Sequence, residues 1–345
     1  MATETSTDRD VITSNGLGGQ LPAQPVSGAP TPGPGGDGSM VRPGRGFFQR
    51  RPYVWFILPA LTVYAALFIY PTIRAFYLSA FDWSGIGPVN NVIWFDNFVD
   101  VARSRRFRQA AVNSTKLFLV IFVLQNTISL GLAIMLNRRS RMTHVYRTIM
   151  FMPVIMSAVA TGIIWILMLD PIIGIVNPFL ADNGLGGLQR EWQADTFWAM
   201  KTVYLVQFWQ WNGMAVVLYL AGLQNVPEDL RHAALVDGAK PWQVFRDVTF
   251  PMLAPAFTIV TALSFILIYR AFDLIYVLGG TTGQPDGATL VIGVLIYGDA
   301  FGTSSFSNAT RMSFAIAEGV TLFVFLAGVS FLLIKGLGRR EEAMH

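Results

Sequence analysis

The sequence predicts an all-α, polytopic membrane protein with six transmembrane helices, and two observations predict this fold class. Of the 345 residues, 53% are hydrophobic and 13% are charged, and the mean hydropathy is +0.47. These values are typical of a chain whose main solvent is lipid. The chain also contains six apolar stretches of about 20 residues, the length that an α-helix needs to cross the hydrocarbon core of a bilayer.

The charges and the missing residue types exclude several classes of function. The net charge is +4, from 25 basic and 21 acidic residues, and the basic residues are scattered, so nucleic acid is not an expected partner. The chain has no cysteine, which excludes a disulfide or a thiolate metal site. Its histidines lie far apart in the sequence, and no Gly-rich phosphate loop occurs. We therefore expect no catalytic residue, no metal and no cofactor on this chain.

Four regions are expected along the chain. Residues 1–46 are rich in Gly, Pro, Ser and Thr, contain GAPTPGPGGDG, and lack the apolar residues that offset the entropy lost on ordering. This composition predicts a disordered tail, with a docking or regulatory tail as the alternative. Residues 47–110 are expected to hold the first transmembrane helix and an outer segment, residues 111–335 the main transmembrane domain, and residues 336–345 a C-terminal tail.

The predicted spans differ in how uniformly apolar they are. The last four are interrupted by polar or aromatic side chains, and such helices usually turn these side chains toward protein or water rather than lipid. We therefore expect a helical bundle with a wet or substrate-lined interior. The six predicted spans are 54–78, 115–136, 148–169, 202–223, 256–278 and 312–334.

The basic residues outside these spans predict the orientation. Fourteen Lys and Arg residues fall on one side, at the end of the tail from Arg42 onward, in the second and fourth loops and in the C-terminus, and seven fall on the other side. Because Lys and Arg accumulate in cytoplasmic loops, both termini are expected in the cytoplasm. Four arginines at 103–108 are the exception on the outer side, and the aromatic residues that precede them predict an interfacial segment.

The fourth loop, residues 225–255, is too polar to span a bilayer and has its own helix signals. Asn225 is expected to cap a first short helix, with Pro227 in its first turn, and Gly238 ends this helix. Pro241 begins a second short helix, and the later prolines bend the chain into the fifth span. One face of the second helix is expected to hold Trp242, Phe245 and Thr249. An interfacial amphipathic hairpin with no partner is the alternative.

Several residues of this loop keep a spacing known from one family. They are His232, Ala233, Ala234, Asp237, Gly238, Ala239, Phe245 and Pro251. This pattern resembles the EAA loop of the permeases of ABC importers, which have the type I importer permease fold. The resemblance implies that the loop is a coupling helix, which fits a cleft in an ATPase subunit. His232 departs from the family, which usually has Glu there, so only hydrogen bonding by a neutral imidazole could replace the acidic contact.

Further segments resemble the carbohydrate branch of this family, the maltose and glycerol-phosphate type of permease. They are FILPALTVYAALFIYPTIRAFYLSAFDW at 56–83, FDNF at 95–98, Asn113-Ser114-Thr115, and YRAFDLIYVLGGTTGQPDGATL at 269–290. The likeness loosens at residues 307–312. The resemblance implies import of a sugar, a di- or oligosaccharide, by a non-enzymatic subunit of a bacterial cell membrane. It also implies a second permease subunit, two ATPase subunits that bind the ATP, and an extracytoplasmic solute-binding protein as partners.

Span four carries an unusual density of polar and aromatic residues, QFWQWNG at 207–213. Sugar sites combine aromatic faces with amide and hydroxyl groups, and the positions that line the sugar pocket in the resembling maltose permease fall on this span. With one candidate from span five, the expected substrate-binding residues are Gln207, Gln210, Trp211, Met214 and Ser264. The alternative is that two or three of these only join helices through hydrogen bonds.

Other polar residues in or near the spans have different expected roles. Arg270 and Asp273 lie three residues apart near the outer end of span five, which predicts a gating or structural ion pair rather than a sugar contact. Gln125 and Asn126 in span two are expected to serve in packing. Glu318 in span six must be paired, protonated or wetted, because a charged carboxylate is costly inside a bilayer.

Three alternatives to the neutral sugar remain open. An importer of glycerol phosphate or another anionic sugar derivative would place Arg270 against the substrate. A secondary sugar transporter would contain inverted repeats and no coupling loop. A membrane-embedded enzyme would contain a clustered acid, base or metal set within its spans, which this sequence does not show.

Overall fold

The structure of the protein is a computed structural model that describes residues 53–137, 142–302 and 311–342. The predicted tail at 1–46, part of the second loop, and most of the divergent run at 307–312 lie outside these residues. The chain divides into two units, Met1–Leu58 and Pro59–His345, and the arrangement below is that of the second unit.

The described chain is helical apart from one pair of two-residue strands. The elements are α1 Tyr53–Tyr64, η2 Ala65–Ile69, α2 Tyr70–Leu78, β1 Phe81–Asp82, β2 Asn91–Val92, α3 Asp96–Arg103, α4 Arg105–Leu124, η3 Gln125–Ser129, α5 Leu130–Leu136, α6 Thr143–Ile155, α7 Ala158–Leu169, α8 Val176–Asp182, η4 Gly186–Leu188, α9 Thr196–Gln224, α10 Glu228–Val236, α11 Pro241–Val244, η5 Phe245–Thr249, α12 Phe250–Met252, α13 Ala254–Tyr269, α14 Asp273–Gly279, α15 Ile292–Phe301 and α16 Met312–Glu342. The strands pair antiparallel, with Phe81 opposite Val92.

Three helices in the described residues are long and apolar enough to cross a membrane, and two bent pairs raise the number to five. The three unbroken ones are Phe56–Leu78, Arg105–Leu136 and Met312–Leu332. The predicted second span therefore begins ten residues earlier than expected. The helix that contains the predicted sixth span, α16, continues to Glu342, so part of the predicted C-terminal tail is helical.

The predicted fourth span is the single 29-residue helix α9, which is not among the apolar spans. Its length suffices to cross a bilayer, because 29 residues of α-helix rise about 43 Å. Its middle is polar, with buried Gln207 and Gln210. These side chains face the protein interior, which is the arrangement that lets a helix of low hydropathy lie within a bundle.

Two predicted spans are bent or broken. The third consists of α6 and α7, which meet at an angle of 98° where Met156 and Ser157 leave the helical conformation. The fifth ends at Tyr269, and a separate helix, α14, follows from Asp273. The expected bend before the fifth span is confirmed, since the segment ending at Met252 meets α13 at 61°.

The ten-residue helix α15 was not predicted from the sequence. It is apolar but too short to span a bilayer, so it gave no signal to a search for 20-residue stretches. A Cβ added to Gly293 in α15 would lie 2.8 Å from the carbonyl oxygen of Ala271. The helix therefore packs at backbone distance against the break between α13 and α14.

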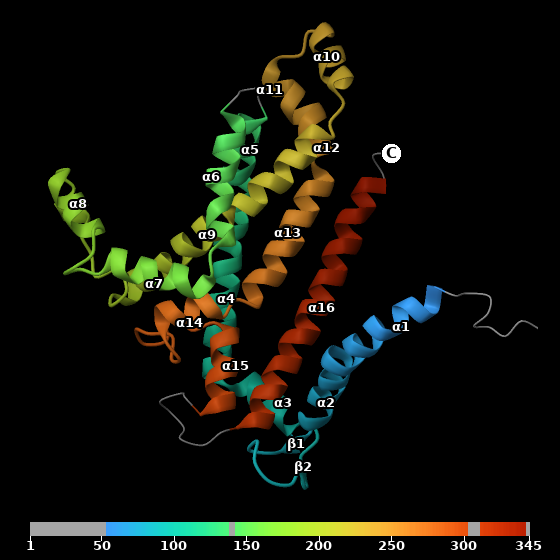
Figure 1. The fold of residues 1–345 in the computed structure, drawn as a ribbon, viewed down its shortest axis with the longest axis vertical. Coiled ribbons are helices and arrows are strands. Elements are labelled where there is room, and N and C mark those ends of the chain that lie inside the picture. The colour runs from blue at the N-terminus through green and yellow to red at the C-terminus, as the bar shows by residue number, and fades with distance from the viewer. Residues whose placement is uncertain (1–52, 138–141, 303–310, 343–345) are drawn as a thin grey trace, which may run out of the picture. The chain divides into compact units, whose positions relative to one another are not determined.

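The two ends of the second unit carry different elements (Figure 1). The short helices α10 and α11 lie at one end, toward which the C-terminal part of α16 points, and β1, β2 and α3 lie at the other end. Between them, α4, α9, α13 and α15 enclose the largest buried apolar cluster, with Leu117, Val203, Phe265 and Leu295 among its members. The long helices therefore hold the loop at 225–255 at the opposite end from the strand pair.

Glycine allows the closest helix contacts. A Cβ on Gly213 of α9 would lie 2.1 Å from the carbonyl oxygen of Met150 in α6. A Cβ on Gly222 of α9 would lie 2.7 Å from Cβ of Ala256 in α13. Small residues that let helix backbones approach are the usual means of packing helices in membranes, where lipid is as apolar as the side chains.

The variant Gly213→Ala should destabilise the protein by about 1–3 kcal/mol, because its Cβ overlaps backbone rather than a movable side chain. Gly131→Ala is the matched control, since Gly131 also lies within a helix but a Cβ there meets nothing within 4 Å. Thermal unfolding of the purified protein in detergent measures the difference. Equal melting temperatures for Gly213→Ala and the unchanged protein would contradict this packing.

Candidate functional site

A line of hydrogen-bonded polar side chains connects α9 to the middle of the predicted second span. There the helix makes a π-helical turn, η3, a feature that occurs often at functional sites. Ser129 of η3 donates its hydroxyl to Oδ1 of Asn212 at 2.5 Å. Tyr219 donates its phenolic hydroxyl to Oδ1 of Asn126. These two bonds satisfy polar groups that lipid could not.

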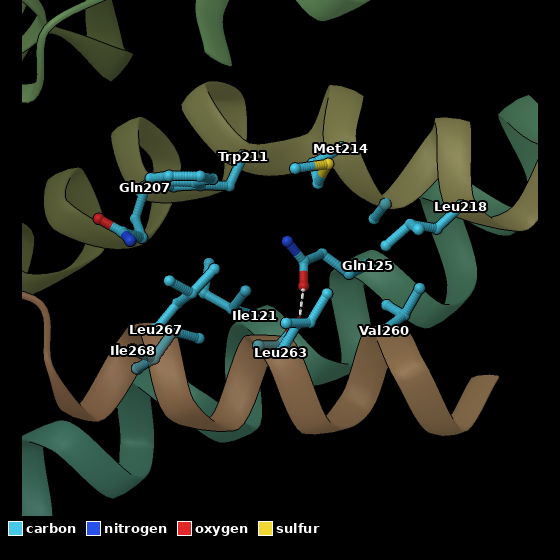
Figure 2. Close-up of a pocket in the computed structure, with 12 residues that line it drawn as sticks. Ile121, Gln125, Gln207, Trp211, Met214, Leu218, Val260, Leu263, Leu267 and Ile268 are labelled. Carbon is cyan, nitrogen blue, oxygen red and sulfur yellow. Dashed lines mark hydrogen bonds between the residues drawn. The ribbon is translucent and has the colours of Figure 1, made fainter. Parts of the chain in front are cut away.

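A cavity lies beside this polar line, between η3, α9 and α13. Its polar and aromatic lining comes from Gln125, Gln207, Trp211, Met214 and Ser264, and its other lining residues are apolar. Figure 2 shows the amide of Gln125 between the α9 side chains and α13, with its oxygen directed toward α13. The cavity volume is about 30 Å³, which holds about two water molecules.

The chemistry of this cavity is neutral and rich in amides. Gln125 and Gln207 are both 5% exposed. Ser264 donates its hydroxyl to Oε1 of Gln125. No charged side chain lines the cavity. An indole face beside amide and hydroxyl groups is the combination that covers the C–H surface of a sugar ring and bonds its hydroxyls.

A second, larger cavity of about 230 Å³ adjoins the first, because both share Gln207 and Trp211 as lining residues. Its lining adds Gln210, Arg270 and Asp273. One cation and one anion contribute, so the charges of the lining cancel. The two cavities together extend from the amide pair toward the break between α13 and α14.

Gln210 also supports the bend between α6 and α7. Its Nε2 donates to the carbonyl oxygen of Met156 at 3.3 Å, and Met156 is the residue at which α6 ends. The bend leaves backbone carbonyls without helical partners. Gln210 therefore both lines the larger cavity and stabilises the bend between α6 and α7.

The predicted pairing of Arg270 and Asp273 is wrong for this structure. Within the described ranges these two side chains form no ion pair with each other. The prediction assumed one continuous helix face, but Arg270 caps the end of α13 and Asp273 is the first residue of α14. Spacing of three residues brings side chains together only where the helix continues.

The five residues predicted to bind substrate all line these two cavities. Four line the first cavity, and Gln210 lines the second. Two other residues of the same polar stretch point elsewhere, since Trp209 packs its ring against Trp165 at 5.6 Å and Asn212 bonds Ser129. The sequence analysis assigned Gln125 to helix packing and did not predict that it lines the cavity. The signal available was the polar run QNTIS within an otherwise apolar span.

Glu318 and an adjacent ion pair lie where α4, α15 and α16 meet. Glu318 is 0% exposed, and neither of its carboxylate oxygens has a hydrogen-bond partner in the described part of the chain. Arg106 of α4 and Asp299 of α15 form an ion pair at 3.0 Å that lies within electrostatic reach of Glu318. The residue flagged in the sequence is therefore buried beside charges rather than exposed to lipid.

The loop at 225–255 folds as the two predicted short helices. The first, Glu228–Val236, ends in a Schellman motif, in which Gly238 donates to the carbonyl of Leu235 at 3.1 Å and Ala239 donates to that of Ala234 at 3.0 Å. Gly238 has φ of +83°, a conformation that costs other residues energy. The predicted helix stop is therefore confirmed.

Two details of the loop differ from the prediction. Asn225 caps the C-terminal end of α9 rather than the start of α10, whose N-cap is Pro227. Trp242 and Thr249 do not share a face, since Trp242 is 66% exposed and Thr249 is 8% exposed. The π-helical turn η5, Phe245–Thr249, changes the number of residues per turn, and this shifts the face that the α-helical period predicted.

The second short helix begins at Pro241 as predicted, and the backbone N–H of Lys240 donates to Oε1 of Gln243 at 2.7 Å. Exposed apolar side chains lie on the loop, with Val236 at 88% and Trp242 at 66% exposure. Exposed apolar clusters on a soluble surface mark protein contacts.

Hydrogen bonds from the nearby Arg246 hold the pKa of Asp247 below its usual value.

The motif residues of the loop differ in exposure. His232, Ala233, Asp237 and Gly238 are exposed, whereas Ala234, Ala239, Phe245 and Pro251 are half-buried. The exposed members therefore face away from the bundle and are accessible to another protein. In the described ranges, no three His, Asp or Glu side chains are grouped so that they could hold a metal ion.

Tyr219→Phe should lower stability by about 1 kcal/mol, because it leaves Oδ1 of Asn126 without its partner within the bundle. Combining it with Asn126→Leu should cost less than the sum of the two single changes, since both ends of the bond are then apolar. Thermal unfolding of the three variants measures this coupling. Strictly additive effects would show that the bond does not connect α9 to η3.

Comparison with known proteins places the chain among transport proteins. It is 33% identical over 273 residues to the lactose transport system permease protein of Rhizobium radiobacter, covering 79% of this chain and 91% of that protein. It is 28% identical over 278 residues to the trehalose/maltose transport system permease protein of Thermococcus litoralis, covering 81% of this chain and 90% of the relative.

The fold is shared with solved permeases. The crystal structure of a bacterial ABC transporter involved in alginate import contains a chain that matches with a TM-score of 0.71 at 23% identity, covering 85% of this chain and 97% of that one. The model of one family, described as the inner membrane component of binding-protein-dependent transport systems, matches residues 125–340. This match covers more than half of the chain and includes the loop at 225–255 and every lining residue of the two cavities except Ile121. The chain therefore belongs to the family of inner-membrane components of binding-protein-dependent transport systems.

Proposed function

We propose that this permease carries a neutral di- or oligosaccharide across the cell membrane into the cytoplasm. The observation that carries the proposal is the cavity in which Gln125, Gln207 and Trp211 present amides and an indole face without any charge. Relatives whose names include lactose, trehalose and maltose support a sugar as the substrate class.

The size of the cavities supports a mechanism in which the site opens. Small-molecule sites measure roughly 300–1,000 Å³, whereas the two adjoining cavities measure about 30 and 230 Å³. A disaccharide enters only after α9 and α13 separate or after a second permease subunit completes the site. Alternating access between the two sides of the membrane supplies this separation.

The proposed complex contains a second permease, two ATPase subunits and an extracytoplasmic solute-binding protein. A structural neighbour crystallised in complex with a ligand-bound periplasmic protein supports the last partner. The ATPases bind the ATP, and they contact the loop at 225–255 through its exposed residues, among them His232 and Trp242. Movement of the loop then shifts α13 through the 61° bend that joins them.

We propose that the coupling loop and both termini lie in the cytoplasm. The excess of Lys and Arg in the tail, the second and fourth loops and the C-terminus supports this orientation. The position of α10 and α11 at the end toward which the C-terminal part of α16 points is consistent with it (Figure 1). The strand pair and α3 then face the outside.

An anionic sugar derivative is the second candidate substrate, and one observation favours it. Arg270 lines the larger cavity and has no ion-pair partner among the described residues. The carboxylate of Asp273 in the same lining would repel an anionic substrate, so we propose the neutral sugar over the anionic one.

A panel of sugars tests the substrate class. The assembled complex in proteoliposomes is supplied with its binding protein and with lactose, maltose, trehalose, diacetylchitobiose or glycerol phosphate in turn. We expect ATP hydrolysis and uptake to rise with at least one neutral sugar and not with glycerol phosphate. Stimulation by the anion alone would favour the second candidate, and uptake by this chain without ATPases would identify a secondary transporter.

Gly238→Pro should leave membrane insertion intact and abolish transport or ATPase association. Proline cannot adopt φ of +83° and lacks the N–H that bonds Leu235. Gly184→Pro is the control. Gly184 also has a positive φ, of 73°, but it follows α8 and is not part of the loop at 225–255. Co-purification of the ATPase subunits is the readout. Normal association and uptake by Gly238→Pro would rule out this coupling role.

A further inference from the structure

Gln125 differs from its neighbours Asn126 and Ser129 because one end of its side-chain amide has no hydrogen-bond partner among the described residues. It is 5% exposed and lies at the first position of the π-helical turn η3. Its neighbour Asn126 uses both ends of its amide, since Oδ1 accepts from Tyr219 and Nδ2 donates to the carbonyl of Phe122 at 2.6 Å. Ser129 is likewise bonded to α9.

The two ends of the Gln125 amide have different surroundings. Oε1 accepts the hydroxyl of Ser264, which fixes the plane of the amide. Nε2 has no protein acceptor among the described residues. Figure 2 shows this nitrogen directed across the cavity toward α9, on the side of Trp211 and Met214. Two N–H donors are therefore held toward a small, mostly apolar cavity.

The amide of Gln207 lies on the opposite wall of the same cavity. It too makes no hydrogen bond within the described part of the chain, and it is 5% exposed. Amide groups that lack a protein partner and border a cavity can bond a ligand or water that enters it. A pair of such amides on two helices, with an indole face beside them, can bond a molecule that offers several oxygen acceptors on an otherwise apolar frame.

We propose that Gln125 is a substrate-binding residue that selects the sugar by donating Nε2–H to one of its hydroxyl oxygens, with Ser264 as its positioning residue. This inference rests on the proposed function and adds a contact from η3, on the second span, to those expected from α9 and α13. Gln125 therefore completes a three-sided site, in which the hydroxyl of Ser264 sets the direction of the donor.

A purely structural role for Gln125 makes a different prediction. The bond between Ser264 and Oε1 alone joins η3 to α13, and it needs no free donor. If that were the whole role, Gln125→Met and Ser264→Ala would lower stability alike and leave the choice of sugar unchanged. A binding role instead changes the discrimination between sugars that differ at one hydroxyl.

The test uses the complete complex with its binding protein and monodeoxy analogues of whichever sugar in the panel is transported. In the unchanged complex, removal of the hydroxyl that Gln125 bonds should lower uptake about 3- to 10-fold, the loss expected for one neutral hydrogen bond. In Gln125→Met this discrimination should fall to about 1-fold for that hydroxyl and persist for the others. Unchanged discrimination at every hydroxyl would overturn the assignment.

Asn126→Leu is the matched control, because it removes the adjacent amide of the same turn, which bonds protein at both ends. It should lower the melting temperature and keep the discrimination of the unchanged complex. Loss of discrimination in Asn126→Leu as well would show that any disturbance of η3 has this effect, and it would also overturn the assignment.

The absence of cysteine from the chain allows a second readout. Gln125→Cys introduces the only thiol of this subunit, and a methanethiosulfonate reagent should modify it more slowly while sugar is being transported. Equal labelling with and without sugar, in a complex that transports it, would contradict the contact. If the unchanged complex transports none of the sugars, the proposed function is wrong and this inference fails with it.

Discussion

Polar groups within the bundle must find partners inside the protein, because the surrounding lipid offers none. Around η3 the structure meets this constraint by pairing side chains across helices. Tyr219 bonds Asn126, Asn212 bonds Ser129, and Ser264 bonds Gln125. Each bond has one member on η3, so a single π-helical turn sets the register of α9 and α13 against the second span. The candidate site exists because this pairing leaves a few donors over.

The same constraint explains where the helices break. Non-helical backbone at membrane depth is tolerated only where protein or water covers it. The bend after α6 is covered by Gln210, which bonds Met156. The break after α13 is covered by α15, whose Gly293 meets Ala271 at backbone distance. Both breaks border the larger cavity, so two non-helical segments of the chain adjoin the proposed sugar path.

The sequence predicts the elements whose signals are local. Long apolar stretches identify most spans, and Gly238 and Pro241 mark the two short helices of the loop at 225–255, since their backbone preferences act within a few residues. The bend at Met156, the helix α15 and the separation of Arg270 from Asp273 could not be predicted, because they depend on contacts between segments distant in sequence. Gln125 was expected to serve in packing, because a polar residue in a span does not reveal which neighbour it faces. The span-four residues were found because the density of polar and aromatic residues there is unusual and because their positions match those of the resembling maltose permease.

The small volume of the first cavity has a consequence for the cell. A space of about 30 Å³ holds too few water molecules for a continuous wire from one face of the membrane to the other. A permease that rested with a wide, wet site would let protons and ions follow the sugar path and would dissipate the membrane potential. In the proposed transport cycle, the apolar residues that line this cavity would act as a seal that preserves the potential across the membrane while no sugar is carried.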